Sequence, residues 1–438
     1  MANEFKVDGR LKNSLTTNES YDSKQVFEQR IVQTREQIER QISKAGFDLE
    51  ASTQDVATPF KRVAELADIE AGQLGQWYNR FGSIAEFALC QLLVQLEAGY
   101  LTKKGINPLD HLAATVFPSG MGAIDTVARH LVRQIPITER QGKRVLHGET
   151  VYFNTNDVFG PRMEEMGLEA ALRVDTGDTQ ELKTTLQQNP KVIAVYFEPV
   201  TNPLIQYTDT REVSEVVREH NVPVIVDNTF LTPYLQQPLR MGADVVIHSL
   251  TKYMNGQGDL TAGVVIGPKE LIKEIRNLQT ESGMVISSAE TALTLYNRVS
   301  ELPQRMEQHL ANAREITDFL KSPVCRKYVQ EVYFPELTTR DTRYGLPGAV
   351  VSFTPKGDTP EQRQQKEAEL MQYVIEHPGS LVHKVSLGES DHLFFGETTF
   401  GYGSGTLPFG VVRLAVGRKS ADDAIQHLKA ALENVYRD

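Results

Sequence analysis

The sequence predicts an α/β protein with a large, doubly wound and mainly parallel sheet and a smaller C-terminal α/β part. Three observations predict it. Short β-branched runs alternate with helical stretches between about residues 110 and 275, a rhythm typical of βαβ units. Two of these runs end at ionisable residues, where open α/β sheets bind ligands. Beyond about residue 285 a second, shorter alternation of helix and strand follows.

The length of the chain indicates more than one domain. A chain of 438 residues is long for a single hydrophobic core and favours two or three domains. We predict an N-terminal arm with a helical segment over 1–75, a large domain over 76–284 and a small C-terminal domain over 285–438. No internal repeat is visible in the sequence.

The first predicted element is an amphipathic helix over residues 23–45, with Gly46 as its stop. Its apolar residues recur at helical spacing, namely Phe27, Ile31, Ile38 and Ile42. The polar face mixes acidic, basic and amide side chains. A membrane-surface helix would present a basic face, so we expect this helix to face the core or another subunit.

Runs of β-branched and aromatic residues predict the strands of the large domain. These runs are 145–146, 192–197, 222–227, 245–248 and 263–266. In the C-terminal domain the pattern predicts a helix over 288–321, strands at 349–353 and 411–416, and a last helix over 420–436. The glycine-rich stretch 401–405 is predicted to be a loop.

Two strand ends deliver the residues with the most distinctive chemistry. The apolar run 242–248 leads to Lys252, and the run 222–226 ends at Asp227. A lysine supplies an amine for a Schiff base, and an aspartate supplies a fixed negative charge. Each residue alone reads as an ordinary strand-end or turn residue. Together, and in this order, they predict a site for pyridoxal 5'-phosphate (PLP).

The chemistry of PLP explains why these residue types are needed. Its ring nitrogen must stay protonated, so a buried carboxylate beside it raises the nitrogen's pKa. The lysine must lose a proton to react, which a partly buried, cation-lined pocket favours. Ser249 and Thr251 flank the lysine, and their hydroxyl groups can donate hydrogen bonds to a phosphate.

The stretches 227–233 and 244–256 resemble the PLP signature of the Cys/Met metabolism enzymes. This family includes cystathionine γ-synthase, cystathionine γ-lyase, methionine γ-lyase and acylhomoserine sulfhydrylase. The similarity covers roughly residues 76 to 435 and extends over 117–124, 198–203, 385–388 and 412–417. It implies the aspartate-aminotransferase type of fold (fold type I), with a large PLP-binding domain. The first 75 residues match poorly.

The resemblance also implies roles near the cofactor. A glycine-bearing turn at a helix start exposes amides to an anion, and by resemblance the amides of Gly120 and Met121 hold the phosphate. An ordinary N-cap serine at Ser119 is the alternative. Tyr152 matches the aromatic residue that stacks on the pyridoxal ring and exchanges protons with the substrate. Asn202 matches an asparagine near the cofactor 3'-oxygen.

Further residues concern the substrate and the subunit arrangement. Arg413 lies in an apolar strand, where a buried guanidinium needs an anion, either a substrate carboxylate or an internal ion-pair partner. Ser386 is expected to help hold that carboxylate. Tyr78 and Arg80 resemble a Tyr-Ser-Arg motif that reaches the phosphate of the neighbouring subunit. The resemblance therefore implies a homodimer with shared active sites, paired into a tetramer.

The sequence departs from the family pattern near the reacting end. Phe153 and Asn154 follow Tyr152 where Gly-Gly is usual, and Gln257 replaces a histidine. Val385 stands where cystathionine-handling members tend to have a glutamate for the distal amino group. Cystathionine is therefore the less favoured substrate.

These features predict chemistry at the γ-carbon of an amino acid. We favour γ-elimination by a γ-lyase, with Lys252 as general base and Tyr152 as candidate acid. The alternative is a γ-replacement transferase. An aminotransferase and a catalytically silent PLP-binding protein are less favoured, because the lysine motif and the intact Lys252, Asp227 and Arg413 argue against them.

Composition limits the partners and the compartment. The net charge of -11 argues against nucleic acid, and no uninterrupted apolar run is long enough to predict a membrane span. Cys90 and Cys325 are too few for a disulfide framework or a zinc site, which predicts a reducing, cytoplasmic location and no metal.

Overall fold

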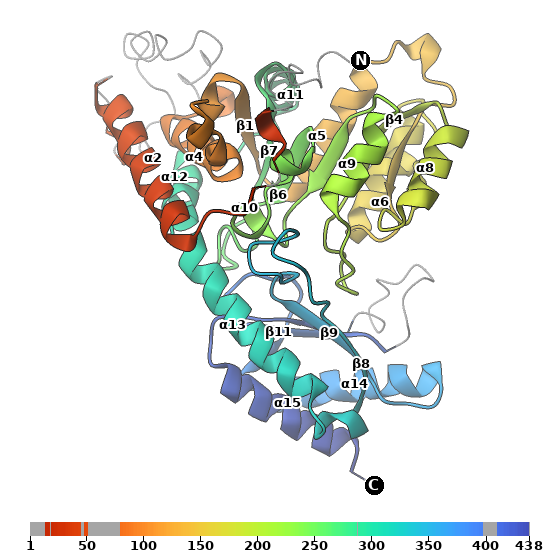
Figure 1. The fold of residues 1–438 in the computed structure, drawn as a ribbon. Coiled ribbons are helices and arrows are strands. Elements are labelled where there is room, and N and C mark those ends of the chain that lie inside the picture. The colour runs from red at the N-terminus through yellow and green to blue at the C-terminus, as the bar shows by residue number, and fades with distance from the viewer. Residues whose placement is uncertain are drawn as a thin grey trace.

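The computed structural model describes residues 14–17, 19–44, 48–50, 79–286, 288–396 and 410–437. In this part of the chain two sheets lie one below the other in Figure 1, and a long helix, α13 (Leu302–Lys321), runs from the first along the second. Tyr78 and the glycine-rich stretch 401–405 lie outside the described residues. The domain boundaries at 75/76 and 284/285 stay predictions.

The first sheet is the predicted doubly wound, mainly parallel one. Its strands lie in the order β1-β7-β6-β5-β4-β2-β3, and only β7 of these runs antiparallel to both of its neighbours. The bounds are β1 (Leu112–Phe117), β2 (Arg144–Gly148), β3 (Leu172–Val174), β4 (Val192–Phe197), β5 (Val224–Asp227), β6 (Val245–Ser249) and β7 (Gly263–Pro268). The five predicted strands are β2, β4, β5, β6 and β7.

Helices cover both faces of this sheet, so its central strands are buried on both sides. On one face pack α5 (Gly120–Arg133), α6 (Phe153–Phe159), α7 (Pro161–Glu165) and α11 (Lys269–Ser282). On the other pack α4 (Ile84–Ala98), α8 (Thr179–Gln188), α9 (Thr210–Arg218), α10 (Thr232–Leu235) and α12 (Ala289–Val299). The helical stretch Ile84–Lys104 is long and apolar enough to cross a membrane, but 89% of its most apolar window is buried inside the protein, as in a core helix.

The second sheet has the order β10-β11-β12-β9-β8. Its strands are β8 (Val329–Tyr333), β9 (Val350–Pro355), β10 (Leu381–His383), β11 (His392–Gly396) and β12 (Val412–Ala415), and it packs against α13, α14 (Pro360–Glu376) and α15 (Ala421–Val435). The predicted strands are β9 and β12, and the predicted last helix is α15. The helix predicted over 288–321 is instead two helices, because Pro303 opens a new first turn.

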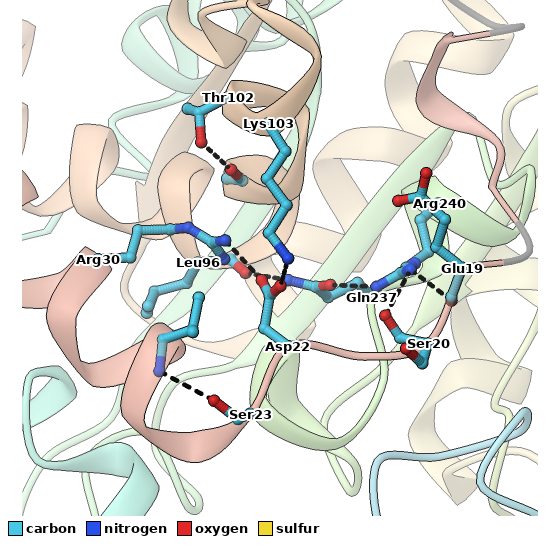
Figure 2. A network of polar contacts seen from close by, with 12 residues as sticks. Glu19, Ser20, Asp22, Ser23, Arg30, Leu96, Thr102, Lys103, Gln237 and Arg240 are labelled. Carbon is cyan, nitrogen blue, oxygen red and sulfur yellow. Dashed lines mark hydrogen bonds and ion pairs between the residues drawn. The ribbon is translucent and has the colours of Figure 1, made fainter.

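The N-terminal segment packs against its own chain. α2 (Lys24–Lys44) is the predicted amphipathic helix, and all four of its predicted apolar residues are buried. Figure 2 shows Asp22, just before this helix, between Arg30 and Lys103, with which it forms ion pairs. Burial alone would raise the pKa of Asp22, but Lys103 and Arg30 hold that pKa below its usual value.

The same segment also reaches the second half of the chain. The Tyr21 hydroxyl donates to the Asp341 carbonyl at 3.2 Å, and Lys24 pairs with Glu307 of α13. Arg240 donates to the Glu19 carbonyl at 2.7 Å (Figure 2). The segment thus ties the helices of the first sheet to those of the second.

Candidate functional site

A cavity of about 280 Å³ lies at the carboxyl ends of β4, β5 and β6, where the loops of the second sheet meet the first. Parallel strands present their ends at one edge of the sheet, which is why residues from distant segments converge there. Ten of the predicted site residues line it: Gly120, Met121, Tyr152, Asn202, Asp227, Ser249, Thr251, Lys252, Ser386 and Arg413. The structure brings these residues together at one place.

Lys252 follows β6 and extends its amine across the cavity. Its Nζ donates a hydrogen bond to the Ser386 hydroxyl at 2.9 Å. Burial, and then the positive charge of Arg413, lower the pKa of Lys252 from 10.5 to about 8, although Glu389 opposes them. This amine therefore loses its proton more readily than an ordinary lysine does, and its uncharged form can act as a nucleophile or base.

The backbone around Lys252 is held by close packing. Gly388 has a φ of 87°, and a Cβ there would lie 2.5 Å from the Tyr253 nitrogen and 2.7 Å from the Lys252 carbonyl carbon. Only glycine allows the Ser386 loop to approach so closely. From the other side, buried Arg305 donates to the carbonyls of Tyr253 at 3.2 Å and Met254 at 2.8 Å.

Asp227 ends β5 and is only 9% exposed. One carboxyl oxygen accepts from the Thr229 amide at 3.0 Å and from the Thr229 hydroxyl at 2.5 Å. The other accepts from the Tyr196 hydroxyl at 3.3 Å. Burial raises the pKa of Asp227, and these donors oppose the rise. A cationic ring nitrogen beside the carboxylate would favour its charged form.

The sequence prediction missed Glu198, the residue after β4. It is 8% exposed, lines the cavity, and accepts the backbone N–H of Tyr152 at 2.6 Å. Burial, and then the charge of Asp227, raise the pKa of Glu198 well above its usual value. The signal that identified Asp227, an acid at the end of a buried strand, was also present here. Thr229 and Tyr196 act through contacts that no local pattern reveals.

The helix start at Gly120 fits the phosphate of the cofactor. The Ser119 hydroxyl caps α5 by accepting from the Gly122 amide at 3.0 Å. A Cβ at Gly120 would lie 2.9 Å from the Ser249 Cβ, so glycine lets the helix start lie against Ser249. The Thr251 hydroxyl already donates to the Ala262 carbonyl at 3.2 Å. Ser249 and the helix amides are therefore the better phosphate donors.

Arg413 of β12 faces the same cavity and is 6% exposed. Its guanidinium donates to the Asn202 side-chain oxygen at 3.0 Å and to the Ser386 carbonyl at 3.3 Å. These contacts orient the guanidinium beside Lys252. Such a planar donor suits the bidentate binding of a carboxylate.

Tyr152 and Arg80 differ in their relation to the cavity. Tyr152 lies before α6, is 38% exposed, and has its backbone fixed by Glu198. Arg80, in the short helix η3 (Asn79–Phe81), lies with its guanidinium 4.4 Å from the centre of the Phe81 ring and donates to the Thr280 carbonyl. Arg80 is not among the described residues that line this cavity.

Known proteins are similar to this chain in sequence and in fold. Residues 44–433 match the family described as Cys/Met metabolism PLP-dependent enzyme. The chain is 31% identical to an L-methionine gamma-lyase of Pseudomonas putida over 82% of this chain and 86% of that protein. It is 30% identical to a cystathionine gamma-lyase of Bacillus subtilis, over 89% and 97%.

The fold comparison agrees. A crystal structure of cystathionine gamma synthase from Xanthomonas oryzae, in complex with aminoacrylate and cysteine, superposes with a TM-score of 0.69 and 27% identity, covering 82% of this chain and 87% of that one. The lysine, the buried acid and the helix start at Gly120 are the kinds of group that PLP requires. The chain belongs to the PLP-dependent enzymes of Cys/Met metabolism.

Proposed function

We propose that this protein catalyses PLP-dependent γ-elimination on an amino acid that carries a leaving group at its γ-carbon. The observation that carries the proposal is the convergence of Lys252, Tyr152 and Arg413 on one cavity. Relatives named L-methionine gamma-lyase and cystathionine gamma-lyase support it.

Each of these residues has a separate role in the proposed reaction. The bound cofactor supplies an electron sink for negative charge at the substrate α-carbon. Arg413, oriented by Asn202 and Ser386, binds the substrate α-carboxylate. Lys252 takes the α-proton, and its lowered pKa suits that task near neutral pH. Tyr152, which lines the same cavity, donates a proton to the departing group.

The lining of the cavity favours elimination over replacement. The acidic and basic side chains among its described lining residues are Glu198, Asp227, Lys252 and Arg413. The last three have assignments at the cofactor or the α-carboxylate, and Glu198 accepts the Tyr152 backbone N–H. The other side chains around them include apolar ones: Val200, Phe230, Val385 and Leu387. A second amino acid would bring two more charges to this surface. γ-Replacement stays the second candidate because the structural neighbours include a cystathionine gamma synthase.

Product analysis separates the two reactions. The purified enzyme is incubated with methionine, O-acetylhomoserine and γ-halogenated amino acids, each with and without an added thiol. We expect a 2-oxo acid and ammonia without thiol. A new thioether that forms only when thiol is present would instead identify a transferase.

We further propose that each active site is shared between two subunits, in a dimer that pairs into a tetramer. Arg80 lies outside its own cavity, which supports a role at the partner's phosphate. The test mixes Lys252→Ala subunits with Arg80→Ala subunits, each inactive or weakened alone. A mixed dimer with shared sites contains one intact site, so activity should rise well above that of either parent. If each site lies within one subunit, mixing gives no such gain.

The proposed location is the cytoplasm. Cys90 and Cys325 are both buried as free thiols, which suits a reducing compartment. The net charge of -11 supports a small-molecule substrate over a nucleic-acid partner.

A further inference from the structure

We infer that Glu198 is a positioning residue that acts in its protonated form, holding Tyr152 by its backbone while leaving the negative charge to Asp227. The inference rests on the proposed function only for the role of Tyr152. It depends on the strand register, on the contacts of the two acids and on the start of α6.

The strand register places the two acids side by side. β4 and β5 are parallel neighbours, with Phe197 paired to Val226. Glu198 directly follows β4 and Asp227 is the last residue of β5, so the two residues after this pair are neighbours about 5 Å apart at the backbone. Both are buried and both line the cavity.

Two carboxylates so placed cannot both ionise easily. Asp227 accepts three hydrogen bonds, from the amide and hydroxyl of Thr229 and from Tyr196, and all three favour its charged form. Within the described part of the chain, the Glu198 carboxyl group accepts one hydrogen bond, from the Tyr152 N–H. Of the two acids, Glu198 is therefore the one that stays protonated. The raised pKa of Glu198, caused by burial and by Asp227, agrees.

The other ionisable groups of the cavity do not reverse this assignment. The amine of Lys252 is held by Ser386, and the guanidinium of Arg413 is held by Asn202. Tyr196 is buried and neutral, because burial and Asp227 raise its pKa.

The start of α6 explains why Tyr152 needs such a contact. Tyr152 occupies the N-cap position of α6, and its side chain makes no capping hydrogen bond. Its backbone N–H lies outside the helix and donates to Glu198 at 2.6 Å. A protonated carboxyl group and a carboxamide both offer an oxygen acceptor to this N–H. Alanine offers none.

The test compares Glu198→Gln with Glu198→Ala in the full-length holoenzyme. Glutamine keeps the acceptor and the neutral charge, so kcat should stay within a few-fold of the wild type. Alanine should lower kcat by about 100-fold through misplacement of Tyr152. Hydrogen exchange supplies a readout that needs no turnover: peptides containing the Tyr152 amide should stay protected in Glu198→Gln and exchange faster in Glu198→Ala.

Unfolding as a function of pH tests the protonation state. A group whose folded pKa is raised stabilises the protein at low pH, and this stability is lost as pH rises through the folded pKa. Glu198→Gln should therefore become more stable than the wild type as pH rises, with the difference vanishing in acid. An ionised, catalytic Glu198 would give the opposite pattern: Glu198→Gln as inactive as Glu198→Ala, and no stability gain with pH. Neither exchange nor unfolding depends on finding the substrate, so failure of this inference is distinguishable from failure of the proposed reaction.

Discussion

The Lys252→Ala variant should lose about four orders of magnitude in kcat, because the residue serves as both the attachment point of the cofactor and the base for the α-proton. Its amine is the group whose pKa burial and Arg413 lower to about 8. The loss should appear in steady-state formation of the 2-oxo acid, together with loss of the visible absorbance of the lysine-bound cofactor.

Lys327→Ala is the matched control, since Lys327 is an exposed lysine in the short helix η8 (Cys325–Lys327), outside the cavity. That variant should keep the kcat and the absorbance of the wild type. Retention of turnover within tenfold of the wild type by Lys252→Ala would contradict the assignment of Lys252 as the base.

The parts of the site that follow buried strands could be predicted from sequence. A strand buried on both faces produces an apolar run that stops at a polar residue. This pattern is seen in Val245–Ser249 and in Val224–Asp227. Lys252 and Asp227 could therefore be predicted from the sequence, and their order matches a long family motif. Sequence pattern thus locates residues that end an element.

Elements with weak local patterns were missed for physical reasons. β1 contains two alanines and β3 has only three residues, so neither shows a clear β-branched run. α4 is buried on almost every side, which removes the polar face that makes a helix visible as a period. β8 has five residues, lies at the edge of its sheet, and shows no alternation of buried and exposed positions.

Residues that act through tertiary contacts could also not be predicted from the sequence. Gly388 matters because its loop packs on Lys252, and Arg305 matters because its guanidinium binds the carbonyls of the segment after Lys252. Their partners lie more than fifty residues away or on another sheet, so no window of sequence contains both. The proposed role of Arg80 needs a second subunit.

The Asp227→Asn variant should lower kcat by about 10² to 10³-fold, a loss typical of removing one group that stabilises charge in the transition state. Asparagine keeps the size of the side chain and can still accept from Thr229, but it carries no charge to keep the ring nitrogen protonated. Because burial raises the pKa of Asp227, its ionisation costs stability as pH rises. The variant should therefore fold as well as the wild type at neutral pH, or better, while turning over more slowly.

Asp244→Asn provides the comparison for Asp227→Asn, because Asp244 is also a buried aspartate on this sheet. It lies just before β6, at the end opposite the cavity, and accepts the Val224 amide at 2.9 Å. Asparagine offers the Val224 amide only a neutral, weaker acceptor, so we expect Asp244→Asn to lower the free energy of unfolding and to leave the kcat of the folded enzyme unchanged. Asp227→Asn should thus lose kcat and keep its free energy of unfolding, whereas Asp244→Asn should keep kcat and lose free energy of unfolding. Steady-state kinetics and denaturant unfolding on both variants measure the two quantities. Equal kcat values for the two variants would remove Asp227 from the mechanism, since burial alone would then account for both.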